Sequence, residues 1–191
     1  MSETDLHRWT VAAAVIETDD GVLMVRNRRR GGRHDWTPPG GVVESSEEIL
    51  DALAREVREE TGLIVGSWGP LLYEVEAVAP DLGWHLRALI FRAGETSGEL
   101  RVGDDPDGIV VDAAWVPPDA CEATLAEAHD WVREPFLEWL RERFDGGGPI
   151  GITSRSARAR RACRGGERTP MVSDAARTIL HVDMDAFFVS V

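Results

Sequence analysis

The chain has 191 residues, of which 43% are hydrophobic, enough for one domain of ordinary size plus an appendage. Its formal net charge of −13 argues against a nucleic-acid duplex as the main partner, because binding phosphates needs a clustered positive surface. No apolar run approaches the roughly 20 residues that span a bilayer, no secretory signal is visible, and two cysteines are too few for a disulfide framework. We therefore expect a cytoplasmic protein whose main domain contacts neither a membrane nor nucleic acid.

Two hydrophobic segments near the start are expected to pair as strands. Residues 9–17 predict a buried strand and residues 21–27 its antiparallel partner, because Asp19-Asp20-Gly21 between them is a turn signal. A basic, glycine-containing loop follows. The two prolines and two glycines of residues 37–41 disfavour regular structure and predict a shaped loop.

The next segment, residues 46–61, is predicted to be a helix. Ser45 followed by Glu48 is the capping-box pattern, and Gly62 suits the position just after the last turn. Hydrophobic residues recur every four positions on the side expected to be buried, namely Ile49, Leu53 and Val57.

Three further strands and two helices are expected downstream. The strands are predicted at about 71–79, 85–92 and 109–115, and the helices at 121–129 and 134–144. Pro135 fits the second helix only at its start, since proline is tolerated in the first turn.

Three carboxylates gather near the end of the predicted 46–61 helix. Glu56, Glu59 and Glu60 have i, i+3, i+4 spacing, so they project from one side, close to a helix end where the macrodipole disfavours negative charge. A divalent cation such as Mg²⁺, which prefers carboxylate oxygens, resolves this repulsion. Arg55 is placed to pair with Glu59, and Glu47 to reach a basic partner. The alternative is a solvated helix face.

The spacing of these residues resembles the Nudix box. Gly41 is followed after five residues by Glu47, and after seven more by the run from Arg55 to Leu63, REVREETGL. Trp36, Pro39 and Gly40 fit the usual lead-in, whereas Pro38 stands where an aliphatic residue is common. The resemblance covers about residues 8–144.

This resemblance implies an α/β fold, a Nudix-type α/β/α sandwich with a mixed sheet, that binds Mg²⁺ or Mn²⁺. By the resemblance, Glu56, Glu59 and Glu60 are the metal ligands, the Gly41 carbonyl is a further one, and Arg55 holds Glu56 in place. The implied reaction is hydrolysis of a nucleoside diphosphate linked to another group, with a small-molecule nucleotide as substrate. The identity of that nucleotide is not specified by the box.

Residues outside the box are assigned from their chemistry and position. Arg28, Arg30 and Arg33 are candidates to receive substrate phosphates, with a solubilising loop as the alternative. The general base is either Glu56 or a carboxylate of the later loop that holds Asp104, Asp105 and Asp107. Three tryptophans, which are either core residues or stacking surfaces for a base, are Trp36, Trp68 and Trp84.

The C-terminal part differs in composition from the domain at residues 1–148. Residues 149–177 are rich in Arg, Ala, Ser and Gly and predict a disordered linker. Residues 178–191 resemble the opening strand of Y-family (DinB-like, polymerase IV) DNA polymerases, in which the counterpart of Asp183 binds metal and that of Phe188 excludes ribonucleotides. The rest of such a polymerase is missing, so this fragment is expected to be inactive. Both a fusion and translation into a neighbouring gene remain open.

Two classes of function follow from these patterns. The first is a Nudix hydrolase acting on diphosphate bonds, with cleansing of the nucleotide pool as one role. The second is a non-catalytic nucleotide-binding module, or a Nudix domain fused to a truncated polymerase. The carboxylates discriminate the two, since only an enzyme loses turnover when they are neutralised.

Overall fold

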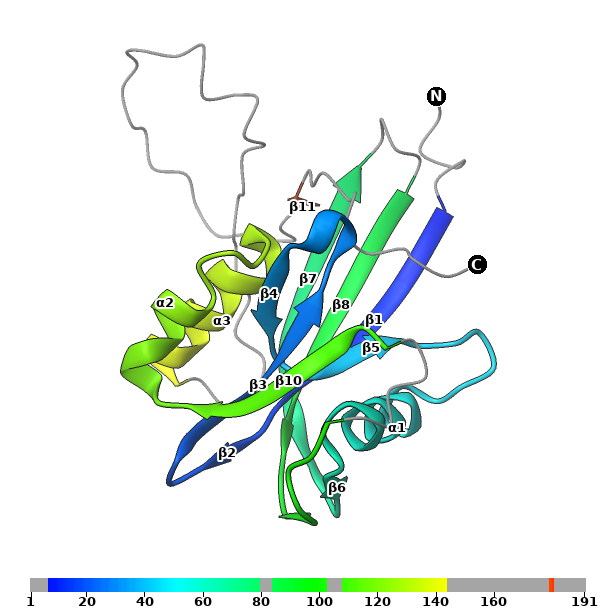
Figure 1. Cartoon of the computed structure of the whole chain (residues 1–191). Helices are drawn as coiled ribbons and strands as arrows, with labels where there is room; N and C mark the ends of the chain where they lie inside the picture. Colours follow the sequence, from blue (N-terminus) through cyan, green and yellow to red (C-terminus); the bar gives the residue numbers. More distant parts are fainter. Residues whose placement is uncertain (1–6, 80–83, 103–107, 144–178, 181–191) are drawn as a thin grey trace.

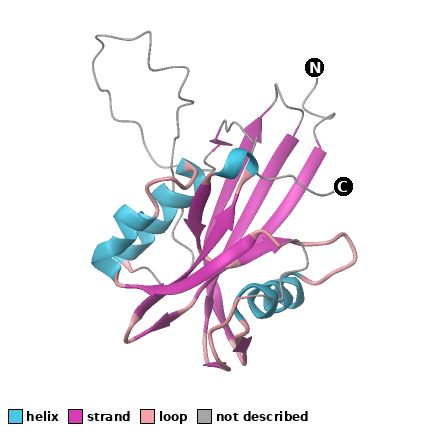
Figure 2. Cartoon of the chain, in the orientation of Figure 1, coloured by secondary structure: helices cyan, strands magenta, loops and turns pink. Residues whose placement is uncertain are grey.

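The computed structural model describes residues 7–79, 84–102, 108–143 and 179–180. Within them, α1 (Ile49–Thr61) lies on one side of the strands, and α2 (Cys121–Thr124) and α3 (Asp130–Glu142) lie on the other (Figure 1, Figure 2). The predicted α/β/α sandwich is therefore confirmed.

The larger sheet is mixed, as predicted. Its order is β11 (Ile179–Leu180), β7 (Trp68–Ala79), β8 (Trp84–Ala93), β1 (His7–Val15) and β5 (Gly40–Val42). Strand β1 runs parallel to β8 and antiparallel to β5, and β7 runs antiparallel to β8. The pairing of β1 with β8 extends over the whole of β1, which leaves β5 on its other edge.

The smaller sheet is built around β3 (Gly21–Arg28). Its order is β10 (Val110–Val116), β3 and β2 (Glu17–Thr18), and β4 (His34–Thr37) also pairs with β3. The expectation that residues 21–27 pair with residues 9–17 is wrong for most of the strand, because β8 and β5 occupy both edges of β1; only the end of the predicted strand, at Ile16 and Glu17, pairs with Leu23 and Val22. The chain changes sheet after Ile16, and only short β2 continues the hairpin. A separate pair, β6 (Ile64–Val65) with β9 (Thr96–Ser97), lies next to α1.

The predicted loop at residues 37–41 is also wrong in part. Strand β4 ends at Thr37 and β5 begins at Gly40, so only the two prolines lie between strands. Proline lacks an amide hydrogen but keeps its carbonyl. Pro39 uses that carbonyl to accept the Ala14 amide hydrogen, with nitrogen and oxygen 2.8 Å apart, and so ties this segment to the main strand.

Helix α1 begins three residues later than predicted. Glu48 is its extended N-terminal residue and makes no capping side-chain hydrogen bond, so the capping-box expectation is wrong. The preceding residues form a turn in which the Glu47 amide donates to the Glu44 carbonyl at 3.0 Å. The predicted end is confirmed, because Gly62 has a φ of 72° and donates to the Arg58 carbonyl at 2.9 Å.

The two C-terminal helices differ from their predicted ranges. Helix α2 ends at Thr124 instead of near residue 129, because turns follow it. Helix α3 begins at Asp130, so Pro135 lies inside the helix and not at its start. Pro135 is buried, which shows that packing outweighs the helical hydrogen bond that proline cannot donate.

Two hydrophobic cores fill the sandwich. One lies on the α3 side and includes Val22, Met24, Val116, Leu125, Phe136 and Trp139. The other lies beneath α1 and includes Ala12, Leu23, Leu53, Val57 and Leu63. The predicted buried side of the helix is confirmed, since Leu53 and Val57 are fully buried and Ile49 packs against the same core.

Several predictions fall outside the described residues. They are the extra carboxylates Asp104, Asp105 and Asp107, the linker at 149–177, and the polymerase-like residues Asp183 and Phe188. Of the C-terminal segment the structure describes only β11, which pairs in parallel with β7. Among the described residues, no helix is both long and apolar enough to cross a bilayer.

Candidate functional site

One arginine connects three carboxylates at the site. Arg55 donates from Nε and Nη2 to the two oxygens of Glu47, at 3.0 and 3.1 Å. Its Nη1 donates to Glu56 at 2.9 Å and to Glu59 at 3.2 Å. The expected pairing of Arg55 with Glu59 and with Glu56 is thus present in the structure. The loop residue Glu47, two positions before the first residue of α1, accepts with both carboxylate oxygens and so orients the guanidinium.

The charges of this cluster reinforce one another. The hydrogen bonds to Glu47 raise the pKa of Arg55, and the same hydrogen bonds lower the pKa of Glu47. Both side chains remain partly exposed, at 31% for Arg55 and 23% for Glu47, so solvent screens the pair. Arg55 therefore stays a cation, and it orients carboxylates from α1 and from the preceding loop together.

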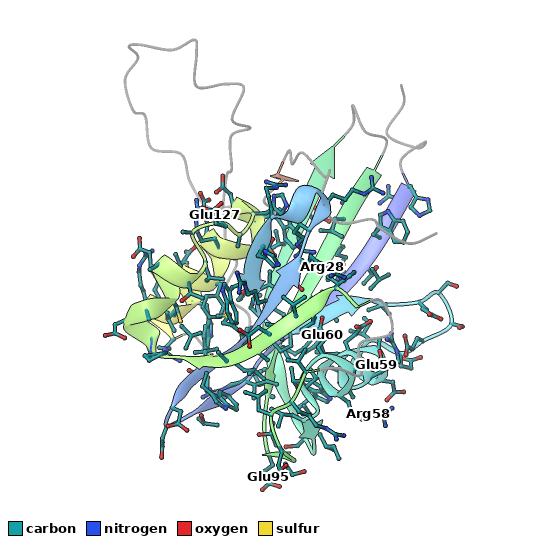
Figure 3. The ribbon with its side chains drawn as sticks, viewed as in Figure 1. Arg28, Arg58, Glu59, Glu60, Glu95 and Glu127 are labelled. Carbon is teal, nitrogen blue, oxygen red and sulfur yellow. The ribbon has the colours of Figure 1, made fainter. Side chains whose placement is uncertain are left out.

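Glu60 takes a different position from its neighbours on α1. Its side chain is buried and accepts the Gly40 amide hydrogen, with nitrogen and oxygen 2.8 Å apart. Figure 3 shows Glu60 on the side of α1 that faces the strands, with Arg58 on the opposite side. The bond joins α1 to β5. This contact was not predicted from the sequence. The adjacent glycines Gly40 and Gly41 could have indicated it, because glycine has no side chain to shield its backbone amide.

Gly41 lies directly against Glu56. A Cβ atom added at Gly41 would lie 2.5 Å from the carboxyl carbon of Glu56, so any other residue there would require the Glu56 carboxylate to move. Glycine at position 41 therefore leaves the Glu56 carboxylate in its present place. The backbone of β5 and the carboxylate of α1 share one small volume at this point.

The donor set at this site has the chemistry of a hard cation. It consists of carboxylate oxygens and the Gly41 backbone, and Mg²⁺ and Mn²⁺ prefer oxygen donors. In the described part of the chain, no three His, Cys, Asp or Glu side chains already converge on one point suited to a metal ion. Arg55 and the Gly40 amide hold the carboxylates instead. The residues fit a divalent cation, and their assignment as ligands stays a prediction.

The predicted phosphate-binding arginines lie at and after the end of β3. Arg28 is exposed and donates to the Gly108 carbonyl at 3.0 Å. Arg30 is the first residue of a short 3-10 turn (Arg30–Gly32), Arg33 directly follows the turn, and both arginines are exposed. The structure records no ion pair between these three arginines and the described carboxylates of α1. Their role as phosphate ligands stays a prediction.

Two partly buried polar pairs at β3 and β4 were not predicted from the sequence. Asn27 donates to the Thr37 hydroxyl at 3.0 Å, and Arg29 donates to both oxygens of Asp35, at 2.9 and 3.1 Å. Burial lowers the pKa of nearby His129, and Asp35 acts against that shift. The sequence offers no signal for Arg29, because it stands among four other arginines of one basic segment.

Comparisons with known proteins agree on one family. A model described as the NUDIX domain matches residues 6–140. The chain is 32% identical over 135 residues to the ADP-ribose pyrophosphatase of Methanocaldococcus jannaschii, covering 70% of this chain and 76% of that protein. It is 33% and 34% identical over 122 residues to 8-oxo-dGDP phosphatase NUDT18 of Mus musculus and Homo sapiens. That match covers 64% of this chain but only 36% of each of those relatives.

A solved structure of similar fold supports the same grouping. The MutT NUDIX hydrolase from Burkholderia pseudomallei aligns with a TM-score of 0.57 and 26% sequence identity. The alignment covers 69% of this chain and 97% of that chain. The shared region therefore corresponds to almost the whole of the smaller protein.

Proposed function

Because the chain belongs to the Nudix family, we propose that it hydrolyses the diphosphate linkage of a nucleotide joined to another group, with the help of a divalent cation. Its relatives include an ADP-ribose pyrophosphatase and an 8-oxo-dGDP phosphatase, both of which are named for small nucleotides. We therefore expect a small nucleotide as the substrate of this chain as well.

The residues of α1 and β5 have separate roles in this proposal. Glu56, Glu59 and Glu60 hold Mg²⁺ or Mn²⁺, together with the Gly41 carbonyl. When bound, the cation neutralises charge on the diphosphate and acidifies the attacking water. Arg55 does not touch the substrate and acts as a positioning residue for Glu56 and Glu59. Glu47 in turn orients Arg55.

The single observation that carries the proposal is the Arg55 cluster. The guanidinium of Arg55 donates hydrogen bonds of at most 3.2 Å to Glu47, Glu56 and Glu59. Glu56 and Glu59 lie toward the C-terminal end of α1, where the helix dipole favours basic residues over carboxylates. A helix that served only for packing would not need this arrangement. Orienting partners of this kind are a regular feature of metal-binding carboxylates.

Two candidates exist for the general base that removes a proton from the attacking water. Glu56 is one, since its carboxylate lies beside Gly41 at the centre of the site. The second is a carboxylate from Asp104, Asp105 or Asp107, which belong to the segment outside the described residues. Replacement of Glu56 by Gln and of each Asp by Asn, with the pH dependence of turnover as readout, separates them.

The test of the proposal is hydrolysis by the full chain. ADP-ribose, 8-oxo-dGTP, 8-oxo-dGDP and diadenosine polyphosphates would be incubated with Mg²⁺ or Mn²⁺, and again with a chelator. We expect cleavage within the diphosphate of at least one compound, abolished by the chelator, with the products identified by mass spectrometry. Absence of metal-dependent cleavage by a folded sample would overturn the proposal.

The remaining alternative is a nucleotide-binding module without turnover. In that case the full chain would bind nucleotide in the presence of metal and release unchanged nucleotide. The same panel, analysed for bound compound after rapid filtration, distinguishes this behaviour from hydrolysis.

The C-terminal segment is a separate part of the proposal. We infer a boundary near residue 148, with the linker and the polymerase-like fragment contributing nothing to hydrolysis. A chain ending at residue 148 should hydrolyse the substrate at the rate of the full chain. A large loss on truncation would show that the C-terminal residues belong to the active unit.

A further inference from the structure

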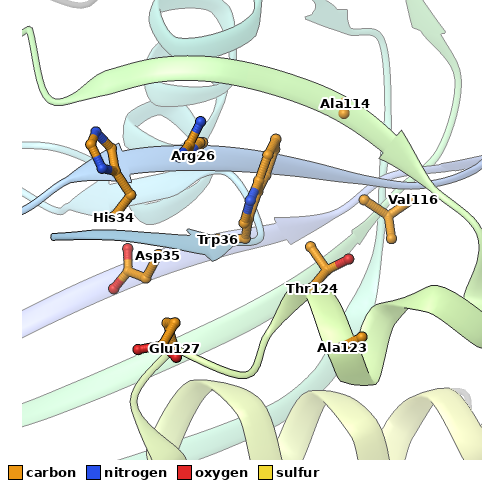
Figure 4. A pocket seen from close by; sticks show the side chains of 9 residues that line it. All are labelled: Arg26, His34, Asp35, Trp36, Ala114, Val116, Ala123, Thr124 and Glu127. Atoms are coloured by element: carbon orange, nitrogen blue, oxygen red, sulfur yellow. The ribbon is translucent and has the colours of Figure 1, made fainter.

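The two sheets differ in how their outer parts are covered. On the smaller sheet, the segment around α2 lies over β3, β4 and β10 and encloses with them a cavity of about 390 Å³ beside Trp36 (Figure 4). On the larger sheet, β7 pairs with β8 along one edge, from Trp68 to Ala79. Of the described strands, only the two-residue β11 pairs with the other edge, at Glu76 and Ala77 (Figure 1). An edge strand of this length is a template for pairing with another strand.

The N-terminal half of β7 is unsuited to such pairing. Pro70 has no amide hydrogen to donate, and the register between β7 and β8 shifts twice between Trp68 and Tyr73. Proline and bulges are common means by which an edge strand avoids pairing with another chain. Residues 75–79, in contrast, keep an unbroken register with β8 and contain no proline. Only this part of β7 has the regular backbone to which a further strand can be added, and β11 pairs here.

Charge gives residues 75–79 little protection. Edge strands are often guarded by charged side chains, lysine above all, and this chain contains no lysine. The carboxylate of Glu74 accepts two hydrogen bonds from Arg87 of β8, at 2.7 and 2.9 Å, and Glu76 lies opposite the same arginine. The hydrogen bonds to Glu74, and then the charge of Glu76, raise the pKa of Arg87. These carboxylates are therefore compensated within the sheet and do little to repel an approaching strand.

We propose that residues 75–79 of β7 form a strand-docking edge, that the C-terminal segment of the same chain occupies it through β11, and that this occupancy prevents two copies of the chain from joining through β7. Adding a strand to an open edge relies on main-chain hydrogen bonds. Strand β11 runs parallel to β7, and parallel neighbours need a connection of about a dozen residues or more. Residues 143–178, between α3 and β11, exceed that length.

Two features favour the chain's own segment over a second copy. Helix α3 packs against β7, so the chain leaves the helix close to the strand on which β11 docks. Docking within one chain does not depend on protein concentration, whereas docking between copies does. The intervening residues 155–168 also carry six arginines and one glutamate, in a chain with a net charge of −13. Electrostatic attraction therefore holds this connection near the acidic domain.

The first test replaces both residues of β11 by proline in the full chain. Proline donates no amide hydrogen and is not accommodated inside a sheet, so Ile179→Pro together with Leu180→Pro should release the segment from β7. Ser156→Pro together with Ala157→Pro, in the connection, is the matched control. Hydrogen exchange of residues 75–79, followed by mass spectrometry, should be about tenfold or more faster in the β11 variant than in the unchanged chain and the control.

Sedimentation velocity at several protein concentrations then tests the second part of the proposal. The unchanged chain and the control should sediment as monomers throughout, and the β11 variant should shift toward a dimer as its concentration rises. Equal exchange in the β11 variant and the unchanged chain would show that β11 does not cover the edge and would overturn the proposal. A β11 variant that stays monomeric would overturn it as well, and so would an unchanged chain that is itself dimeric. None of these readouts involves hydrolysis, so the proposed function is tested separately.

Discussion

At the scale of single residues, the site depends on Arg55 more than on any other side chain of α1. The five N–H donors of its guanidinium have a fixed planar geometry, and the group makes four hydrogen bonds to three carboxylates. Lysine has the same charge but a single ammonium group, so it cannot hold Glu47 by two parallel bonds and reach the other two carboxylates as well.

We therefore predict that Arg55→Lys lowers the affinity for Mn²⁺ by about 10–100-fold, the usual loss when a residue that orients metal ligands is changed. The affinity would be measured by electron paramagnetic resonance of free Mn²⁺. Arg58→Lys, an exposed residue of the same helix, is the control and should not alter it. If Arg55→Lys binds Mn²⁺ as the unchanged chain does, Arg55 does not position metal ligands.

A second prediction at this scale concerns acid. The hydrogen bonds from Arg55 hold the pKa of Glu47 below its ordinary value of 4.5. The stabilisation from this pair is fully present above that value and is lost as the pH falls through the lowered pKa of the folded protein. The free energies of unfolding of the unchanged chain and of Glu47→Gln should therefore differ above pH 4.5 and converge as the pH falls below it.

Urea denaturation at several pH values measures this convergence. Glu48→Gln is the matched control, because Glu48 is the exposed neighbour of Glu47 and makes no capping side-chain hydrogen bond. A constant difference between Glu47→Gln and the unchanged chain over the whole acidic range would contradict the assigned pair.

At the scale of elements, the C-terminal end of helix α1 is held by the segments around it. Gly62 ends the helix with a φ of 72°, and a Cβ atom there would lie 2.6 Å from the Arg101 side chain and 3.0 Å from the Glu99 carbonyl oxygen. Gly40 at the start of β5 supplies the amide for Glu60. The carboxylates are therefore positioned by the whole loop–helix–loop unit.

We predict that Gly62→Ala lowers the free energy of unfolding by about 1–2 kcal/mol, the cost of the left-handed conformation for an L-residue. The comparison is Gly66→Ala, since a Cβ atom at Gly66 has ordinary contacts of 3.5 Å and no positive φ. Chemical denaturation measures both. Equal stability of the two variants would contradict the assigned role of Gly62.

The elements also show what could be predicted from the sequence. The buried side of α1, its end at Gly62 and most strands follow from local patterns of apolar and turn residues. The pairing of residues 21–27 with the first strand was predicted correctly only next to the turn, since nothing local reveals that β8 and β5 fill both edges of β1. Pro135 inside α3 and the short α2 depend on packing against the core, which single-residue preferences do not contain.

The site divides in the same way. The i, i+3, i+4 carboxylates and Arg55 are local to one helix, so their proximity was predictable. The Glu60–Gly40 hydrogen bond joins residues 20 positions apart, and the Arg29–Asp35 pair depends on the pairing of β3 with β4. The cavity beside Trp36 needs three strands and α2 to form, and no segment of sequence indicates it.

At the scale of the whole molecule, net charge shapes the chemistry. A chain with a formal charge of −13 repels a polyanionic nucleotide unless cations intervene. The same negative charge favours the binding of divalent cations over the binding of a nucleotide without metal. Binding of the metal should therefore stabilise the fold as well as prepare the site.

We predict that Mn²⁺ at about 100 times its dissociation constant raises the melting temperature by roughly 5–10 °C, from about 2.7 kcal/mol of binding free energy. Differential scanning fluorimetry measures the shift. Glu59→Gln should abolish most of it, and Glu48→Gln should keep it. A shift that is the same in all three proteins would place the metal elsewhere.

The central claim is that the carboxylates of α1 support metal-dependent hydrolysis of a diphosphate, and one comparison tests it most directly. Turnover of the substrate identified by the panel would be measured for the full chain, for Glu60→Gln and for the control Glu48→Gln. Gln at position 60 can still accept the Gly40 amide hydrogen, so the fold is kept while the charge is removed. Loss of several kcal/mol of charge stabilisation predicts a turnover at least about a hundredfold lower for Glu60→Gln. Glu48→Gln should keep the turnover of the unchanged chain. Equal turnover in all three proteins would contradict the claim.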